Sequence, residues 1–326
     1  RLKGHGELDS IVSRESAFLL NNLVLVGICF TVFLGTIFPL LAEAIRGTKM
    51  SVGTPYFNRV SVPLGMALLL LMGVGPLIAW GRASLNNLKR NFLWPSLAAV
   101  AGAGILFAFG VRQAEVLLAF LLCLFVLGTI VFEFVVATRT RAKATGEGIL
   151  EAFTTLLLKG RRRYGGLIVH LGVVVAIVGI AVSSVYKVER EQTLKQGESL
   201  SVGPYSLRFD GLAAGERPTH ILVWATVMAF KDGKPLHELT PGQRFYPNQQ
   251  TPFGSVDARY HWNEDLYVIL SAFERDGSSA TIKAMINPMI SWIWIGGGVI
   301  LLGVIVAVLP ERRLAMLSVR ARAQAA

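Results

Sequence analysis

The chain has 326 residues, of which 53% are hydrophobic, and its mean hydropathy is +0.53. A soluble chain of this length would form about two domains, whereas this composition indicates a membrane protein with one soluble insert. The formal net charge is +11, but the basic residues gather at the ends of apolar runs, which is typical of membrane topology and argues against nucleic-acid binding.

The first 137 residues predict a short polar segment followed by four membrane helices. Residues 1–17 form the N-terminal segment, in which Ser13 is a candidate helix N-cap with Glu15 in the first turn. The region 18–137 forms the four helices. Their apolar runs cover residues 18–41 (closing near Pro39), 62–80, 93–111 and 116–137.

Three polar side chains within these helices have alternative interpretations. Asn21 and Asn22 lie near the start of the first helix, where amides usually hydrogen-bond to neighbouring helices, although a direct ligand role is the alternative. Glu133 lies near the end of the fourth helix. It is interpreted as the ion-pair partner of Arg139 or Arg141 rather than as part of a proton path.

Residues 138–163 form a basic loop that contains a short amphipathic helix, expected to lie on the membrane surface. Its apolar positions recur at helical spacing, at Ile149, Leu150, Phe153, Leu156 and Leu157. The loop ends in the RRRYGG stretch at 161–166, whose arginine run is typical of a topology signal.

The predicted membrane helix at 164–185 carries a histidine. His170 lies roughly 9 Å beyond Tyr164 along the helix axis, too deep for its imidazole to reach the interface easily. An ionisable side chain at this depth is costly, and neutral imidazole is a haem-iron ligand. From the helix alone, His170 is either a ligand or a structural residue hydrogen-bonded to another helix.

Glycines define two faces of this helix. Gly165, Gly172 and Gly179 recur every seven residues and predict a smooth strip along which another helix packs closely. His170 falls on a different face, and Gly166, one turn before it, leaves space beside the imidazole for a flat group.

Residues 186–287 predict a soluble domain of short β-strands, folded as a small antiparallel β-barrel or β-sandwich. The predicted strands cover 206–209, 221–230, 258–260 and 266–273, with hairpin turns at 231–234 and 275–278. A last membrane helix follows at 288–309, with Trp292 and Trp294 as interfacial anchors or contacts of a ligand edge. Residues 310–326 form the tail.

Basic residues predict the orientation of the chain. With the N-terminus in the cytoplasm, the inner segments hold 3, 3, 7 and 4 Lys and Arg residues, and the short outer loops hold 3 and 1. The insert holds 11, but large domains cross the membrane regardless of charge. Six helices, two cytoplasmic ends and an external β domain fit these numbers, which in a bacterium means the inner membrane and the periplasm.

The remaining reactive residues give weaker signals. The two cysteines, Cys29 and Cys123, fall inside predicted membrane helices and are interpreted as packing residues. No pair among the other histidines has zinc-ligand spacing, and nucleotide-binding and nucleophile-elbow motifs are absent from the sequence. These histidines are His5, His220, His237 and His261.

Several motifs occur in the order found in one family. They are RRRYGG-LIVHLG (161–172), SRES-FLLNN (13–22), SVGTPYFN (51–58) and NP-ISWIWIGGG (287–298). The chain resembles the C-terminal part of the CcmF-type cytochrome c haem lyase over nearly its whole length. In that family the histidine that corresponds to His170 is an axial ligand of a membrane-embedded b haem, and the resemblance favours this role over the structural one.

The resemblance implies a function in cytochrome c maturation, as part of a lyase that joins haem, its substrate, to an apocytochrome. The implied partners are a haem chaperone, a thioredoxin-like apocytochrome-handling protein, apocytochrome c and membrane lipid. One of Arg161, Arg162 and Arg163 is a candidate partner for a haem propionate.

The family's tryptophan-rich WWD motif, its two flanking histidines and a second membrane histidine do not occur in this sequence. The sequence also begins at Arg1, with neither a methionine nor a signal peptide. We therefore expect a fragment or split protein that is incomplete as a lyase, with the second haem ligand supplied by a missing N-terminal half or a partner subunit. The competing interpretation is a multi-pass anchor or permease subunit, with a ligand-recognition β domain and a structural His170.

Overall fold

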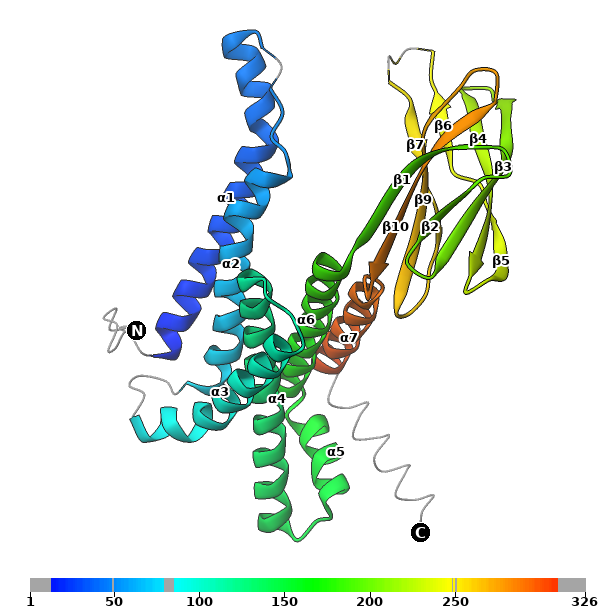
Figure 1. The fold of residues 1–326 in the computed structure, drawn as a ribbon. Coiled ribbons are helices and arrows are strands. Elements are labelled where there is room, and N and C mark those ends of the chain that lie inside the picture. The colour runs from blue at the N-terminus through cyan, green and yellow to red at the C-terminus, as the bar shows by residue number, and fades with distance from the viewer. Residues whose placement is uncertain (1–12, 49, 79–84, 248, 250, 310–326) are drawn as a thin grey trace. The chain divides into compact units, whose positions relative to one another are not determined.

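The computed structural model describes residues 13–48, 50–78, 85–247, 249 and 251–309. The chain divides into a helical unit, residues 1–177 with 296–326, and a second unit, residues 178–295, which contains the strands. The helices in Figure 1 are α1 (Arg14–Arg46), α2 (Thr54–Val74), the 3-10 turn η1 (Gly75–Leu77), α3 (Leu85–Ala108), α4 (Ala114–Thr145), α5 (Ile149–Lys159), α6 (Arg161–Tyr186) and α7 (Trp292–Val308). Most of the predicted N-terminal segment, residues 1–12 with His5, and the tail at 310–326 lie outside the described residues.

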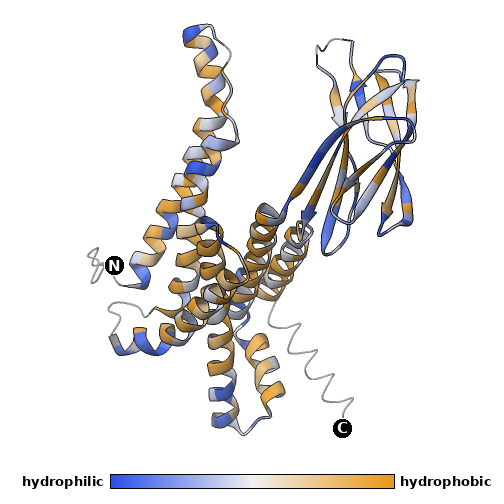
Figure 2. Ribbon diagram, in the orientation of Figure 1, coloured by the Kyte–Doolittle hydropathy of each residue, from blue (hydrophilic) through white to orange (hydrophobic). Residues whose placement is uncertain are grey.

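Among the described helices, five are long and apolar enough to cross a membrane: α1, α2 with η1, α3, α4 and α6. The sixth, α7, has 17 residues without a charged side chain. Figure 2 shows the predominance of hydrophobic residues along these helices. Many of their large apolar side chains are exposed, which in a membrane protein is the surface that faces lipid.

The ends of α1 follow from local capping. Ser13 is the N-cap and accepts a hydrogen bond from the Ser16 backbone N–H at 3.1 Å, as predicted. The helix continues past Pro39 to Arg46, where Gly47 adopts the left-handed conformation (φ 64°) and ends it. The predicted end near Pro39 was therefore wrong, because proline inside an apolar helix is tolerated when neighbouring groups satisfy the freed carbonyl.

Other predicted helix limits also change. The SVGTPYFN motif at 51–58 spans the start of α2, which begins at Thr54 with Gly53 as its N-cap and Pro55 in the first helical turn. α2 ends at Val74, and the 3-10 turn η1 carries the helical segment on to Leu77. The predicted limit at residue 80 lies outside the described residues. α4 extends to Thr145, beyond 137, and α6 begins at Arg161, so the arginine run is its first turn.

The glycine strip of α6 packs against α7, as the seven-residue spacing predicted. A Cβ atom added at Gly165 would lie 2.8 Å from the Gly303 carbonyl oxygen, and one at Gly172 would lie 2.6 Å from that of Gly296. In the second unit, a Cβ at Gly179 would lie 2.8 Å from the Met289 carbonyl oxygen. The two backbones touch at each position, so only glycine allows this approach.

The strands of the second unit form two antiparallel sheets, ordered β1-β10-β9-β8 and β2-β3-β4-β6-β7, with β5 paired to β4. Their bounds are β1 (Val188–Lys195), β2 (Ser199–Val202), β3 (Tyr205–Glu216), β4 (Ile221–Lys231), β5 (Lys234–Leu239), β6 (Gly242–Phe245), β7 (Phe253–Ser255), β8 (Asp257–Arg259), β9 (Glu264–Phe273) and β10 (Ser279–Pro288). Three of the four predicted strands fall within β3, β4 and β9, and the fourth, 258–260, overlaps β8 but extends one residue past its end.

One core lies between the faces of the sheets. Buried residues alternate along β9 and β10, and Leu207, Phe209, Val227 and Ile282 are completely buried. The predicted turn at 231–234 joins β4 to β5, and Asp232 and Gly233 both have positive φ, 50° and 78°, as a two-residue hairpin turn requires.

The β domain begins and ends on neighbouring strands. β1, which follows α6, pairs with β10, which precedes α7, and Val188 lies opposite Ile286. Because its two chain ends lie side by side, such a domain can be inserted between two adjacent helices without separating them.

Candidate functional site

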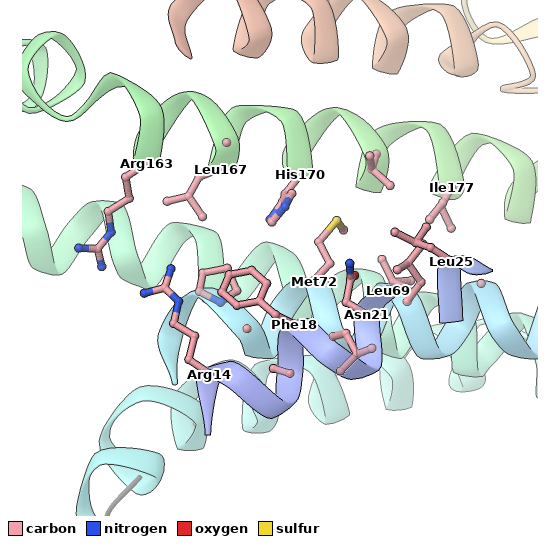
Figure 3. Close-up of a pocket in the computed structure, with 18 of the residues that line it drawn as sticks. Arg14, Phe18, Asn21, Leu25, Leu69, Met72, Arg163, Leu167, His170 and Ile177 are labelled. Carbon is pink, nitrogen blue, oxygen red and sulfur yellow. The ribbon is translucent and has the colours of Figure 1, made fainter. Parts of the chain in front are cut away.

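A cavity of about 710 Å³ lies within the helical unit, between α1, α2 with η1, and α6. This volume is in the range of ligand pockets, and most of the lining is apolar. Figure 3 shows the side chains that point into it. The residues that line the cavity from α1, α2 and α6 include Arg14, Phe18, Asn21, Leu25, Met72, Arg162, Arg163, Gly166, Leu167, His170 and Ile177.

Helical periodicity places these side chains on common faces. On α1, Arg14, Phe18, Asn21 and Leu25 follow one another at intervals of four, three and four residues, so that they form one stripe facing the cavity. On α6 the same spacing continues from Arg163 through His170 to Ile177. This face is distinct from the glycine strip that contacts α7, as predicted.

His170 points from α6 into the cavity (Figure 3). Its Nδ1 atom is buried and has no hydrogen-bond partner among the described residues. A buried ring nitrogen in that condition costs about 1–3 kcal/mol, a cost that a ligand or water would remove. The structural interpretation of His170 predicts a hydrogen bond to another helix, which the described part of the chain does not provide for Nδ1.

Gly166 keeps open the space next to the imidazole. Apart from the backbone of its own helix, a Cβ atom added there would meet no described part of the chain within 4 Å, and Gly166 itself lines the cavity. Together with the buried Nδ1 of His170, this opening means that the residues present fit a large flat group with a metal that accepts an imidazole ligand.

Basic side chains gather at one end of the cavity. Of the three arginines in the run, Arg162 and Arg163 line it and Arg161 does not. Arg14 lines it from α1, with its guanidinium carbon 5.7 Å from the Phe18 ring centre. Figure 3 shows Arg14 and Arg163 at the same end, several residues from His170, so a ligand at the imidazole with carboxylates at its edge would meet guanidinium groups there.

One of these arginines has an acidic partner in α4. Arg163 Nη2 lies 2.5 Å from Glu133 Oε1, and the Glu133 side chain is only 14% exposed. The predicted partners, Arg139 and Arg141, were wrong. Residue 139 lies about 120° around the axis of α4 from residue 133, and residue 141 lies about 12 Å along the axis.

Arg141 instead binds Glu147, just after α4. Two hydrogen bonds of 2.9 Å join the guanidinium to the carboxylate, and they hold the pKa of Glu147 below its ordinary value. This pair stabilises the turn between α4 and α5, and neither of its residues lines the cavity.

Two cavity residues were missed as site candidates. Arg14 was read only as part of a polar segment, although its spacing from Asn21 and Leu25 was a usable signal. Met72 of α2 faces the cavity opposite α6 (Figure 3), and nothing in the sequence separates it from a packing methionine. Asn21 lines the cavity, whereas Asn22 is exposed.

The other candidates lie apart from the cavity lining. The Trp292 indole N–H donates to the Trp262 carbonyl at 3.1 Å within the second unit. His237 and His261 are exposed, and the His220 ring packs on Tyr246, 5.1 Å between centres.

The fold and cavity define a class: a multi-pass membrane protein that carries a β-sandwich between two apolar helices. Residues 185–288 match the family described as CcmF C-terminal beta-sandwich. The chain is 34% identical over 313 residues to the cytochrome c-type biogenesis protein CcmF of Pseudomonas aeruginosa, covering 95% of the chain and 46% of that protein. It is 30% identical to the cytochrome c-type biogenesis protein CycK of Rhizobium meliloti, with 95% and 45% covered.

A solved structure titled cytochrome c heme lyase CcmF has the same fold, with a TM-score of 0.68 and 29% identity. The match covers 92% of this chain and 46% of that one. The chain is thus CcmF-like over nearly its whole length, and the resemblance drawn from its motifs is confirmed. It spans a little under half the length of the relatives it matches.

Proposed function

We propose that the chain acts in cytochrome c maturation, as the part of a haem lyase that holds a b haem within the membrane. The proposal rests on the cavity in which His170 Nδ1, buried and without a hydrogen-bond partner among the described residues, lies beside the open space at Gly166. The similarity of the chain to proteins named for cytochrome c biogenesis supports the same function.

In this proposal, His170 is one axial ligand of the haem iron, and Arg14, Arg162 or Arg163 binds a propionate. The haem would supply one-electron chemistry, keeping the haem to be attached in its ferrous form. The chain's own residues position the group, neutralise its carboxylates and exclude water from its face. The second axial ligand comes from a missing N-terminal half or a partner subunit.

The proposal extends to location and partners. We propose that the β domain lies outside the cytoplasm, in a bacterium on the periplasmic side of the inner membrane, and the basic-residue counts support this orientation. There the β domain is available to a haem chaperone, a thioredoxin-like apocytochrome-handling protein and apocytochrome c.

A maturation assay tests this function. The chain and its missing half are produced in a bacterium that lacks its own lyase, with a reporter c-type cytochrome, and covalent haem is measured by haem staining. We expect His170→Ala to abolish the stain at unchanged protein level, whereas His237→Ala, at an exposed strand position, leaves it intact. A permease subunit with a structural histidine predicts no effect of either variant, and that result would reject the proposal.

A further inference from the structure

An exposed aromatic loop joins β8 to β9 in the second unit. We refer to residues Tyr260–Asn263 as the aromatic loop. The side chains of Tyr260 and Trp262 are 69% and 65% exposed, and neither belongs to the sandwich core. Two large aromatic side chains held in solvent are costly without a partner surface, so the loop calls for an explanation.

Hydrogen bonds attach this loop to the start of α7. The Met289 backbone N–H donates to the Asn263 carbonyl at 2.7 Å, and the Trp292 indole N–H donates to the Trp262 carbonyl at 3.1 Å. Both acceptors are backbone atoms of the loop, so the attachment does not depend on the loop's own side chains.

A buried carboxylate adds a second attachment. Asp265, only 2% exposed, accepts hydrogen bonds from the His261 backbone N–H at 3.0 Å and from the Ser291 hydroxyl at 2.9 Å. The loop is therefore fixed to the first residue of α7 and to residues just before it, all within the second unit. Wherever the first turn of α7 lies in the membrane, the loop lies at the same level.

The length of α7 determines that level. Its 17 uncharged residues extend about 26 Å, slightly less than the roughly 30 Å of a bilayer's hydrocarbon core. If α7 spans the bilayer, both of its ends must therefore lie near the two surfaces of the hydrocarbon core. Its first turn then lies at the boundary between hydrocarbon and headgroups. That turn also presents Trp294, which is 82% exposed.

Trp and Tyr are the residues that favour this boundary, because they combine an apolar ring with a polar N–H or O–H group. We propose that the aromatic loop, together with Trp294, is a membrane-interface anchor that inserts Tyr260 and Trp262 among lipid headgroups. The anchor fixes the base of the β-sandwich to the bilayer surface, in continuity with the α7 span.

Depth-dependent fluorescence quenching tests the anchor. The full chain is placed in nanodiscs of phosphatidylcholine, in which part of the lipid carries a nitroxide quencher either at the headgroup or deep in the acyl chain. The difference between wild type and Trp262→Phe isolates the Trp262 signal. This substitution keeps the backbone carbonyl that accepts from Trp292. Trp224→Phe, in strand β4, is the matched control.

We expect headgroup nitroxide to quench the Trp262 signal roughly twofold or more above its effect on the Trp224 signal, and above that of the deep quencher. A Trp262 signal unchanged by either lipid, and quenched only by aqueous iodide, would overturn the anchor and leave the loop as a docking surface for another protein. The measurement involves no haem, so its outcome is independent of the proposed haem site.

Discussion

Gly165 of α6 and Gly303 of α7 touch backbone to backbone. A Cβ atom on either would lie 2.8 Å from the carbonyl oxygen of the other, whereas the neighbouring Gly166 has no atom within 4 Å of its Cβ position. The two consecutive glycines therefore have different roles: Gly165 permits the helix contact, and Gly166 keeps the cavity open.

This difference predicts opposite effects on stability. Gly165→Ala forces the two backbones apart and should destabilise the protein by about 1–3 kcal/mol. Gly166→Ala should leave stability unchanged or raise it by about 0.5–1 kcal/mol, because alanine favours the helix. Thermal unfolding of the purified chain in detergent measures both variants, and equal melting temperatures would contradict the assigned contacts.

Filling the cavity at Gly166 should remove haem without unfolding the protein. In Gly166→Leu the side chain enters the open space beside His170. The complex of the chain with the half or subunit proposed to supply the second ligand should therefore lose most of its bound haem while its melting profile persists. The haem content is measured as a pyridine haemochrome. A Gly166→Leu complex with full haem content would show that the cavity is not the haem site.

The ion pair between Arg163 and Glu133 should contribute modestly to stability. The Arg163 side chain is 61% exposed, so solvent screens the attraction and we expect a coupling energy of about 0.5–1 kcal/mol. A double-mutant cycle with Glu133→Gln and Arg163→Gln measures it. The matched pair Glu133→Gln and Arg139→Gln should show no coupling, and a coupling to Arg139 would restore the partner assignment rejected above.

Stability of the β domain should depend on Glu264 in acid. Burial raises the pKa of this carboxyl, but hydrogen bonds from Lys231 (2.6 Å) and the Tyr205 hydroxyl (2.8 Å) outweigh burial and hold the pKa below its ordinary value. The lowered pKa means that the ionised form stabilises the fold above about pH 4.5, and that this contribution is lost as pH falls through the lower folded-state pKa.

Glu264→Gln should therefore cost about 1–2 kcal/mol at pH 7, with the difference from wild type shrinking below about pH 4.5. Unfolding of the full chain, followed by near-ultraviolet circular dichroism from pH 7 to 3, measures this. A difference that stays constant over the range would mean that Glu264 is not the titrating group.

Contacts encoded by periodicity were predictable. The seven-residue spacing of Gly165, Gly172 and Gly179 predicted the helix contact, and the separate face assigned to His170 is the face of α6 that lines the cavity. Both follow from helix geometry alone. The strands at 221–230 and 266–273 were equally clear, because apolar runs bounded by Asp-Gly turns are a local signal.

Contacts between distant segments were not predictable. The partner of Glu133 comes from the next membrane helix rather than its own, and no local rule identifies Arg163. β1 was missed because its sequence is polar and nearly all of it is exposed. β10, in contrast, alternates buried and part-buried residues. This two-residue periodicity is a strand signal in the sequence, but it was not used to predict β10.

The most direct test is the visible absorption of the chain purified in complex with the N-terminal half or partner subunit that is proposed to supply the second haem ligand. We expect wild type and His261→Ala, at an exposed histidine, to show the same reducible b-type bands, and His170→Ala to lose them while its melting profile is retained. Bands of full intensity in folded His170→Ala would contradict the assignment of this imidazole as the haem ligand.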